Sequence, residues 1–251
     1  MVILKSIEEI NKIRESSKIV AEILELLREQ LEPGRGTLGL ENTVNEVAKK
    51  RGAVPGFLNY KGFPHSLCVS YNNEVVHGFP CDLCPVDEGD IIGLDVGILK
   101  DGFYGDAAIT VAVGKDETPF ELELLLTATE ECLYQGIKQA VPGNRLGDIS
   151  YAIQLTAEKY GFNIVKDYGG HGVGRNLHED PHINNFGNKG EGLLLKPGMV
   201  LAIEPMLVDG KADVETLEDG WTVATKDGSI AAHFEHTIAI TENGNEILSK
   251  L

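Results

Sequence analysis

The chain has 251 residues, of which 42% are hydrophobic and 24% are charged, as is typical of a folded globular protein. Acidic residues number 39 against 22 basic ones, which gives a formal net charge of −17 and a pI of about 4.8. This acidic excess argues against a protein that binds nucleic acid or anionic membranes by neutralising phosphates, so we expect neither DNA nor a membrane as a partner.

The N-terminus has acids at Glu8 and Glu9 and lacks the basic-then-apolar order of a signal peptide. No apolar run approaches the roughly 20 residues of a membrane span. We therefore expect a cytoplasmic protein. In that compartment its cysteines are expected to be reduced thiols: Cys68, Cys81, Cys84 and Cys132.

The first half of the chain predicts two helices followed by strands. Ser6-Ile7-Glu8-Glu9 is typical of a capping box that opens a long helix, and Pro33-Gly34 ends it. A second helix is predicted over residues 38–50 because apolar residues recur at helical spacing. Alternating segments of β type then run from Cys68 to Val113.

The second half repeats this order. Thr118-Pro119-Phe120-Glu121 predicts a second capping box, whose helix ends before Pro142-Gly143. A shorter helix is predicted over 146–160, ended by Gly161, and strand-like segments follow at 162–168, 199–204, 221–225 and 234–241. Two halves offset by about 110 residues predict one α+β unit, so we expect a single domain over residues 1–251.

A hairpin between two β-type runs contains the first candidate metal ligands. Asp101-Gly102 is a strong signal for a two-residue turn. With Lys100 opposite Phe103, Asp95 and Asp106 become diagonal neighbours on one face, roughly 7–8 Å apart at the backbone. One metal ion or two could bind between these carboxylates. The alternative is a solvated hairpin that happens to carry two acids.

Three further residues are candidates for the same chemistry. His171 lies in a glycine-rich segment, residues 169–175, that we interpret as a loop. Glu204 ends an apolar strand-like run, and Glu235 lies inside another. Singly, each has an ordinary structural explanation, but four carboxylates and one imidazole together suit Mn²⁺, Fe²⁺, Co²⁺ or Zn²⁺. About two divalent cations are needed to balance that much charge, a setting typical of hydrolysis.

At this point the residues show a family resemblance. The series Asp95, Asp106, His171, Glu204 and Glu235 resembles the metal ligands of the methionine aminopeptidase and prolidase superfamily. Seven flanking motifs are similar to those of the type I methionine aminopeptidases: His77-Gly78-Phe79-Pro80, residues 101–106, residues 170–175, His178-Glu179-Asp180-Pro181, residues 203–206, residues 219–222 and residues 234–237.

The resemblance covers essentially the whole chain and has implications for fold and metal binding. It implies the pita-bread fold, in which two pseudo-symmetric helix-helix-strand halves surround a central antiparallel sheet. It also implies two divalent metal ions (Co, Mn, Fe or Zn). Asp95 would chelate one ion, Asp106 and Glu235 would bridge both, and His171 and Glu204 would complete the second site.

The same resemblance implies a catalytic role for three residues. Water activated by the ions would attack the scissile carbonyl, and Glu204 would accept and return its proton. His77 and His178 match the two family histidines that contact the scissile peptide and stabilise the tetrahedral intermediate. For His77 taken alone, a hydrogen-bonded histidine at a strand end is the ordinary alternative.

The substrate pocket implied by the resemblance is narrow and apolar, which suits an unbranched thioether. For Phe57 and Leu177 a place in the ordinary core is equally open. The matching residues are Phe57, Tyr60, Phe63, Cys68, Leu177 and Trp221. Positions that depart from the commoner family pattern, and that bear on rate and specificity, are Lys61, Phe63, Leu177, Gly93 and Ala107-Ala108.

The resemblance therefore implies a hydrolase that removes the initiator methionine from nascent chains whose second residue is small. One alternative is an Xaa-Pro-cleaving relative, which shares the five ligands but usually carries an additional N-terminal domain. Another is a silent binding protein on this scaffold, which typically loses ligands. Residues 208–218 are acidic, so ribosome docking through this segment is only a weak expectation, and we expect a monomer.

Several motifs have no assigned function. Cys81-Asp82-Leu83-Cys84 is a single Cys-x-x-Cys, whereas a structural zinc site needs two, so we interpret it as a pair of loop cysteines. His65, His182 and His233 have no partner in the sequence and are interpreted as surface or core histidines. His236 adjoins Glu235, so we consider a supporting role beside that ligand.

Overall fold

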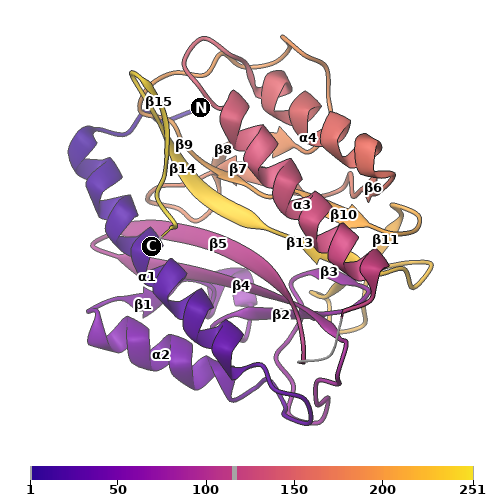
Figure 1. Ribbon diagram of the computed structural model, residues 1–251. Coiled ribbons are helices and arrows are strands. Elements are labelled where there is room, and N and C mark those ends of the chain that lie inside the picture. The colour runs from indigo at the N-terminus through magenta and orange to yellow at the C-terminus, as the bar shows by residue number, and fades with distance from the viewer. Residues whose placement is uncertain (1, 115–117, 251) are drawn as a thin grey trace.

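A computed structural model describes residues 2–114 and 118–250. Its main feature is a nine-stranded antiparallel sheet with the order β1-β4-β5-β14-β9-β7-β8, to which β2 is added beside β4 and β15 beside β14 (Figure 1). The strands are β1 Val54–Pro55, β2 Cys68–Tyr71, β4 Ile91–Lys100, β5 Phe103–Ala112, β7 Gly169–Gly172, β8 Glu179–Asn184, β9 Val200–Ile203, β14 Glu235–Thr241 and β15 Gly244–Ile247.

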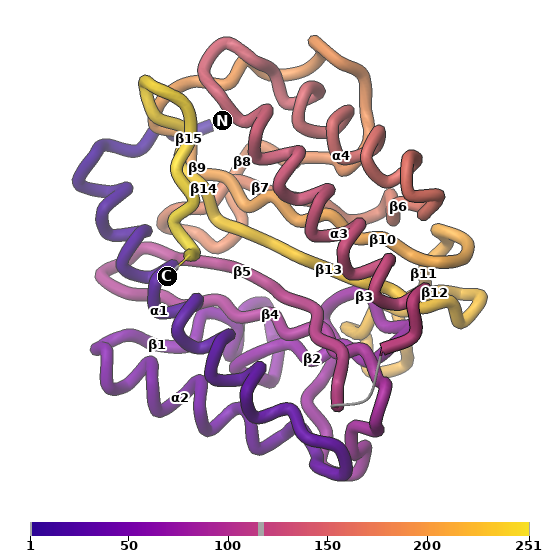
Figure 2. The backbone as a smooth tube through the Cα atoms, in the orientation of Figure 1, coloured from indigo at the N-terminus to yellow at the C-terminus, as the bar shows by residue number. Residues whose placement is uncertain are grey.

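Two helix pairs pack against the two halves of this sheet. The first pair, α1 Ile7–Gln30 and α2 Leu40–Lys50, packs on the β1, β4 and β5 half, and the second, α3 Phe120–Gln139 and α4 Leu146–Tyr160, packs near β9 and β14 (Figure 2). Each pair encloses its own apolar core. This arrangement confirms the expected fold of two helix-helix-strand halves. In the described part of the chain, no helix has the length and apolarity to cross a membrane.

Two small antiparallel sheets lie at one end of the large sheet. One joins β6 Asn163–Ile164, β10 Met206–Val208 and β13 Ala231–His233, and the other joins β3 Glu74–Val76, β11 Val214–Thr216 and β12 Val223–Thr225. A short 3₁₀ helix, η1 Tyr60–Gly62, precedes β2. The ends of β3, β12 and β13 bring His77, Trp221 and His233 to the same cavity.

One of the two predicted capping boxes is confirmed. Ser6 and Glu9 cap α1 reciprocally, with the Glu9 amide 3.2 Å from Ser6 Oγ and the Ser6 amide 3.1 Å from Glu9 Oε2. The box predicted at 118–121 is wrong. Pro119, whose ψ of 136° is extended, is itself the N-cap of α3, so Thr118 lies one residue before the cap; the proline ring has no acceptor, and no side-chain cap bond forms at this helix.

The prediction of a loop around His171 is also wrong, because the glycines form strand β7. A Cβ atom on Gly170 would lie 2.3 Å from the Ala202 carbonyl oxygen, and one on Gly172 would lie 2.3 Å from the Asp180 oxygen. Glycine therefore allows neighbouring backbone to approach His171 unusually closely. The glycine-rich pattern reflects tight strand packing here and does not mark a turn.

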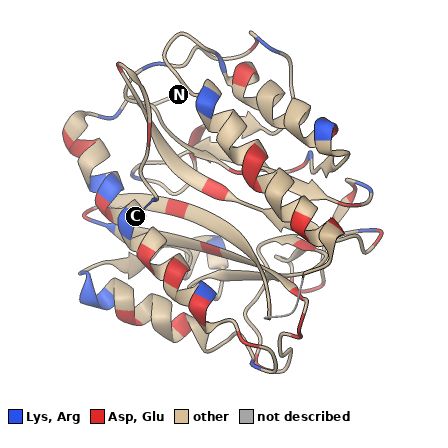
Figure 3. Cartoon of the chain, in the orientation of Figure 1, with Lys and Arg blue, Asp and Glu red and all other residues tan. Residues whose placement is uncertain are grey.

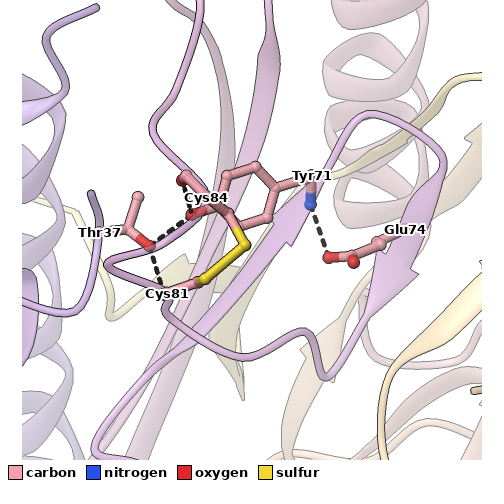
Figure 4. The surroundings of a disulfide bond; sticks show 5 residues. All are labelled: Thr37, Tyr71, Glu74, Cys81 and Cys84. Carbon is pink, nitrogen blue, oxygen red and sulfur yellow. Dashed lines mark hydrogen bonds between the residues drawn. A yellow bond between two sulfur atoms is a disulfide. The ribbon is translucent and has the colours of Figure 1, made fainter. Parts of the chain in front are cut away.

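The cysteines at 81 and 84 differ from the prediction of reduced thiols, because they form a disulfide (Figure 4). The turn between them brings their Cα atoms to 5.4 Å, within the usual range for such a bond. Thr37 anchors this turn: its amide donates to the Cys81 carbonyl at 2.8 Å, and its hydroxyl accepts from the Cys81 amide at 2.9 Å. Cys68 and Cys132 are buried free thiols.

Candidate metal centre

The hairpin of β4 and β5 has the predicted register. Lys100 pairs with Phe103 across the turn, and Asp95 pairs with Ala108, two residues beyond Asp106. Asp95 and Asp106 therefore lie diagonally on the same face of adjacent strands. The turn residue Asp101 has a φ of 49°, in the left-handed region that a two-residue hairpin turn of this kind requires.

Neighbouring strands bring the other three candidates to the same face. Glu235 on β14 pairs with Ala108 of β5, and β14 in turn pairs with β9, which Glu204 directly follows. On the far side of β9, His171 of β7 pairs with Ala202. The order β4-β5-β14-β9-β7 thus places all five residues that the sequence singled out as metal ligands on five successive strands or at their ends.

The side chains of these residues converge. Asp106, His171 and Glu235 each offer a ligand atom, and the three atoms lie within 4.8 Å of one another. His171 Nε2 is 3.8 Å from Asp106 Oδ2 and 3.4 Å from Glu204 Oε1. His171 Nδ1 is 2.9 Å from the Gly172 carbonyl oxygen, so Nδ1 is assigned as the donor and the Nε2 lone pair faces the carboxylates.

Burial makes the negative charge of this cluster costly. It raises the pKa of Asp95 and of Glu204 to about 7, and it raises the pKa of Asp106 and Glu235 well above the ordinary range of carboxyl groups. Neighbouring carboxylates add to the shift at Asp106 and Glu235. A buried group of acids such as this one needs a cation to remain ionised near neutral pH.

Unpartnered oxygens show that the residues fit a metal. Asp95 Oδ1, Asp106 Oδ1 and Glu235 Oε1 are buried and have no hydrogen-bond partner among the described residues. Carboxylate oxygens with one imidazole nitrogen form a donor set suited to divalent ions of intermediate hardness. The cluster is therefore a candidate site for a divalent metal.

A cavity of about 180 Å³ opens beside the cluster. The Phe63 ring contacts Trp221 and Phe57 edge to face, with ring centroids 5.2 Å and 6.5 Å apart. Phe57 and Leu177, for which a core position was equally open, are buried and also line the cavity. The structure thus brings together every predicted pocket residue: Phe57, Tyr60, Phe63, Cys68, Leu177 and Trp221.

The two candidate catalytic histidines lie on this cavity as well. His178 Nδ1 is 3.0 Å from the Tyr60 hydroxyl, and the His178 ring centroid is 4.2 Å from that of His171. His77 has a positive φ of 61° and contacts Trp221 edge to face. Burial lowers the pKa of His77 to about 4 and that of His178 to about 3, so both imidazoles are neutral at pH 7.

Comparison with known proteins identifies the family. The sequence matches the model of metallopeptidase family M24 over residues 11–242. It is 49% identical to a methionine aminopeptidase from Aquifex aeolicus over 99% of this chain and 98% of that protein. This chain belongs to family M24, among the methionine aminopeptidases.

Solved structures agree with this assignment. A methionine aminopeptidase from Thermotoga maritima superposes with a TM-score of 0.97 at 49% identity, covering 100% of both chains. A prolidase from Pyrococcus furiosus matches with a TM-score of 0.79 at 24% identity, covering 99% of this chain and 66% of the prolidase. The second match shows only that the pita-bread fold is shared. Family M24 and the buried ligand cluster together indicate use of a divalent metal.

His233 lines the cavity of this M24 chain, whereas its sequence context predicted a surface or core histidine. Its Nε2 is 3.6 Å from Glu204 Oε2, and its backbone is bonded in both directions to the Thr110 hydroxyl. One signal could have found it: residues two apart in an extended run point to the same side, and His233 is two residues before Glu235.

The remaining histidines of the M24 chain lie elsewhere. The ring of His236 contacts the C-terminal segment and helix α3 instead: its Nδ1 is 2.9 Å from Ser249 Oγ, and its ring packs against Tyr134. His65 Nδ1 is 3.3 Å from Glu41 Oε2, and His182 is exposed. Of the departures from the family pattern, Lys61, Phe63 and Leu177 line the cavity, Lys61 beside Tyr60.

Proposed function

We propose that the chain removes N-terminal methionine from peptides and nascent proteins whose second residue is small. The observation that carries this proposal is the cavity of aromatic rings and one buried thiol directly beside the ligand cluster. A sulfur atom packs favourably against aromatic rings, and a volume of about 180 Å³ suits one unbranched side chain. Trp221, Phe63, Tyr60 and Cys68 would contact the methionine side chain.

We propose two divalent ions, of Mn, Fe, Co or Zn, for the ligand cluster. Asp95, Asp106, His171, Glu204 and Glu235 would hold these ions. The number of carboxylates supports two ions, since one divalent ion would leave buried negative charge uncompensated. When bound, such ions act as Lewis acids and lower the pKa of a coordinated water.

The chain's own residues would move protons and orient the peptide. Glu204 is placed between His171 and His233, so its carboxylate can accept a proton at an Oε atom and return it to the leaving amine. His77 and His178 are neutral at pH 7, so each can donate one N–H bond to the scissile peptide. These hydrogen bonds would strengthen as charge develops on the carbonyl oxygen.

The proposal also covers the organisation of the protein. Residues 1–251 would act as one catalytic domain, as a cytoplasmic monomer whose partner is the N-terminus of a peptide or nascent chain. The segment of residues 208–218 is acidic and contains the exposed residues Asp213, Glu215 and Glu218. Such a surface repels phosphate, so docking to ribosomal RNA would have to use another face.

A peptide assay tests the proposed activity. Met-Gly-Met-Met and an Ala-Pro-terminated peptide are incubated with the enzyme and Mn²⁺ or Co²⁺, and a chelator serves as the control. We expect metal-dependent release of methionine and no cleavage of the Ala-Pro bond. Cleavage of the Ala-Pro peptide alone would contradict the proposal and indicate an Xaa-Pro peptidase, and cleavage of neither peptide despite bound metal would indicate a silent binding protein.

A further inference from the structure

A buried ion pair joins the N-terminal segment to the loop next to the active-site cavity. Lys5 Nζ lies 2.6 Å from Glu179 Oε2, and their side chains are only 3% and 6% exposed. Lys5 Nζ also donates to the Ile3 carbonyl at 3.0 Å, and the Lys5 amide donates to the Gly198 carbonyl at 2.7 Å. The lysine is thus held by both its backbone and its side chain.

The loop of residues 174–179 folds around this pair. The second oxygen of Glu179 accepts from the Asn176 amide at 3.1 Å, and the Gly174 amide donates to the Asn176 carbonyl at 3.1 Å. A Cβ atom on Gly174 would lie 2.5 Å from Glu179 Oε1 and 2.7 Å from Lys5 Cε. The Glu179 carboxylate therefore stands where it organises the loop backbone, and glycine leaves room for it.

His178 and Leu177 occupy the positions directly before Glu179, and both line the cavity. His178 lies at the open edge of the cavity, where its ring hydrogen-bonds to the Tyr60 hydroxyl and contacts the rings of Tyr60 and His171. These contacts orient the ring, and the backbone that carries His178 sets its place along the cavity edge. That backbone is fixed at Glu179, where strand β8 begins and where Lys5 contacts the carboxylate.

We propose that the Lys5–Glu179 ion pair positions His178 for catalysis. Lys5 is a positioning residue: among the described residues it bonds to Ile3, Gly198 and Glu179, none of which lines the cavity, and it acts through Glu179 and the loop of residues 174–179. This inference rests on the proposed function, because it assumes that His178 contacts the scissile peptide. A displacement of about 1 Å in a group that contacts the reacting bond costs a large factor in rate.

The test separates positioning from simple stabilisation by a double-mutant cycle. Removing Lys5 alone leaves a buried charge and risks unfolding, so the main variant replaces both members, Lys5→Met with Glu179→Met. The double substitution is introduced into the natural chain and into the His178→Ala variant, and kcat, KM, metal content and melting temperature are measured for all four proteins. Arg14→Met is the matched control, because Arg14 of α1 forms a more exposed ion pair, with Glu246 of β15.

We expect the double substitution to lower kcat by about tenfold in the natural chain, with metal content unchanged. In the His178→Ala background the same substitution should change kcat by less than about twofold, because the group it positions is already absent. Lys5→Arg, which keeps the cation, should retain most of the activity, and Arg14→Met should behave as the natural chain.

Two results would overturn the inference: an unchanged kcat in the natural chain, or an equal loss in both backgrounds, which would mean that the pair only stabilises the fold. The proposed function fails separately, and visibly, if the natural chain itself releases no methionine.

Discussion

Single residues at the site owe their properties to burial. His77 and His178 stay neutral because their partial burial in the cavity disfavours the imidazolium form, whereas the fuller burial of Asp106 and Glu235 disfavours their ionised form. A bound metal ion would favour the ionised form of these carboxyl groups and would leave the two histidines neutral. The site therefore combines neutral hydrogen-bond donors with carboxylates whose charge depends on the ions they bind.

His178→Ala is expected to lower kcat by roughly 10²-fold, as the loss of a donor to a developing oxyanion does. With the Tyr60 hydroxyl assigned as donor to Nδ1, the ring proton is on Nε2, which is free to bond the substrate. Steady-state kinetics with Met-Gly-Met-Met, together with metal analysis, measure this effect. Tyr60→Phe should cost much less. Full activity of the alanine variant would show that His178 does not contact the reacting bond.

Glu235→Gln is expected to abolish turnover by removing the bridging carboxylate while keeping its shape. The metal-free variant should be at least as stable as the natural chain. Glu235 Oε1 is buried without a hydrogen-bond partner among the described residues, and a negative charge on this buried carboxyl group costs free energy. Metal content after dialysis and melting temperature with a chelator test both statements. Wild-type metal content with full activity would rule out Glu235 as a ligand.

At the scale of elements, strand β7 depends on glycine at positions that no turn requires. Gly170 and Gly172 let the backbone of β7 approach its neighbours while His171, between them, faces the carboxylates. A side chain at either position would push the strand away from β9 or β8. The close packing of this strand is therefore what brings an imidazole into a cluster formed otherwise by β4, β5, β14 and the end of β9.

Gly170→Ala is expected to destabilise the protein by about 1–3 kcal/mol, the usual cost of forcing an extra methyl group into a packed interior. Its Cβ would lie 2.3 Å from the Ala202 carbonyl oxygen, which is backbone and cannot move aside easily. Gly93→Ala on β4 is the matched control, since its Cβ would lie 3.4 Å from the nearest atom, in ordinary contact. Urea denaturation measures both, and equal stability of the two variants would contradict the argument.

For the whole molecule, the site lies where the two halves meet. Asp95 and Asp106 come from the β4–β5 hairpin of the first half, and His171, Glu204 and Glu235 come from the second. Acidic residues outnumber basic ones in the chain as a whole and are distributed over its helices, strands and loops (Figure 3). Neither half contains the complete ligand set, so metal binding should couple the stability of the two halves.

The metal-free protein is expected to lose stability as the pH rises from 6.5 to 8. Raised carboxyl pKa values, about 7 for Asp95 and Glu204, mean that the folded state binds more protons than the unfolded state in this range, so deprotonation favours unfolding. The cavity histidines have lowered pKa values, so they make stability rise with pH. They do so only below about 6.5, the pKa of a histidine in the unfolded chain.

Melting temperatures measured with a chelator should therefore fall across this window, and excess Mn²⁺ should remove the fall because it favours the ionised ligands. Asp95→Asn combined with Glu204→Gln is the control and should make the dependence shallower, leaving the part that comes from Asp106 and Glu235. A melting temperature that rises with pH in the chelated natural chain would contradict the assignment of these carboxylates.

Local sequence signals determined the helices, the hairpin and, with the family resemblance, the candidate ligands. Ser6 and Glu9 cap α1, Gly161 ends α4, and the Asp101-Gly102 turn sets the register of Asp95 and Asp106, because each of these depends only on neighbours along the chain. The tertiary structure alone decided the contacts of His233 with Glu204 and of Lys5 with Glu179, and the tight packing of β7. Residues 5 and 179 meet through strand order and close backbone approach, which no periodicity in a single segment encodes.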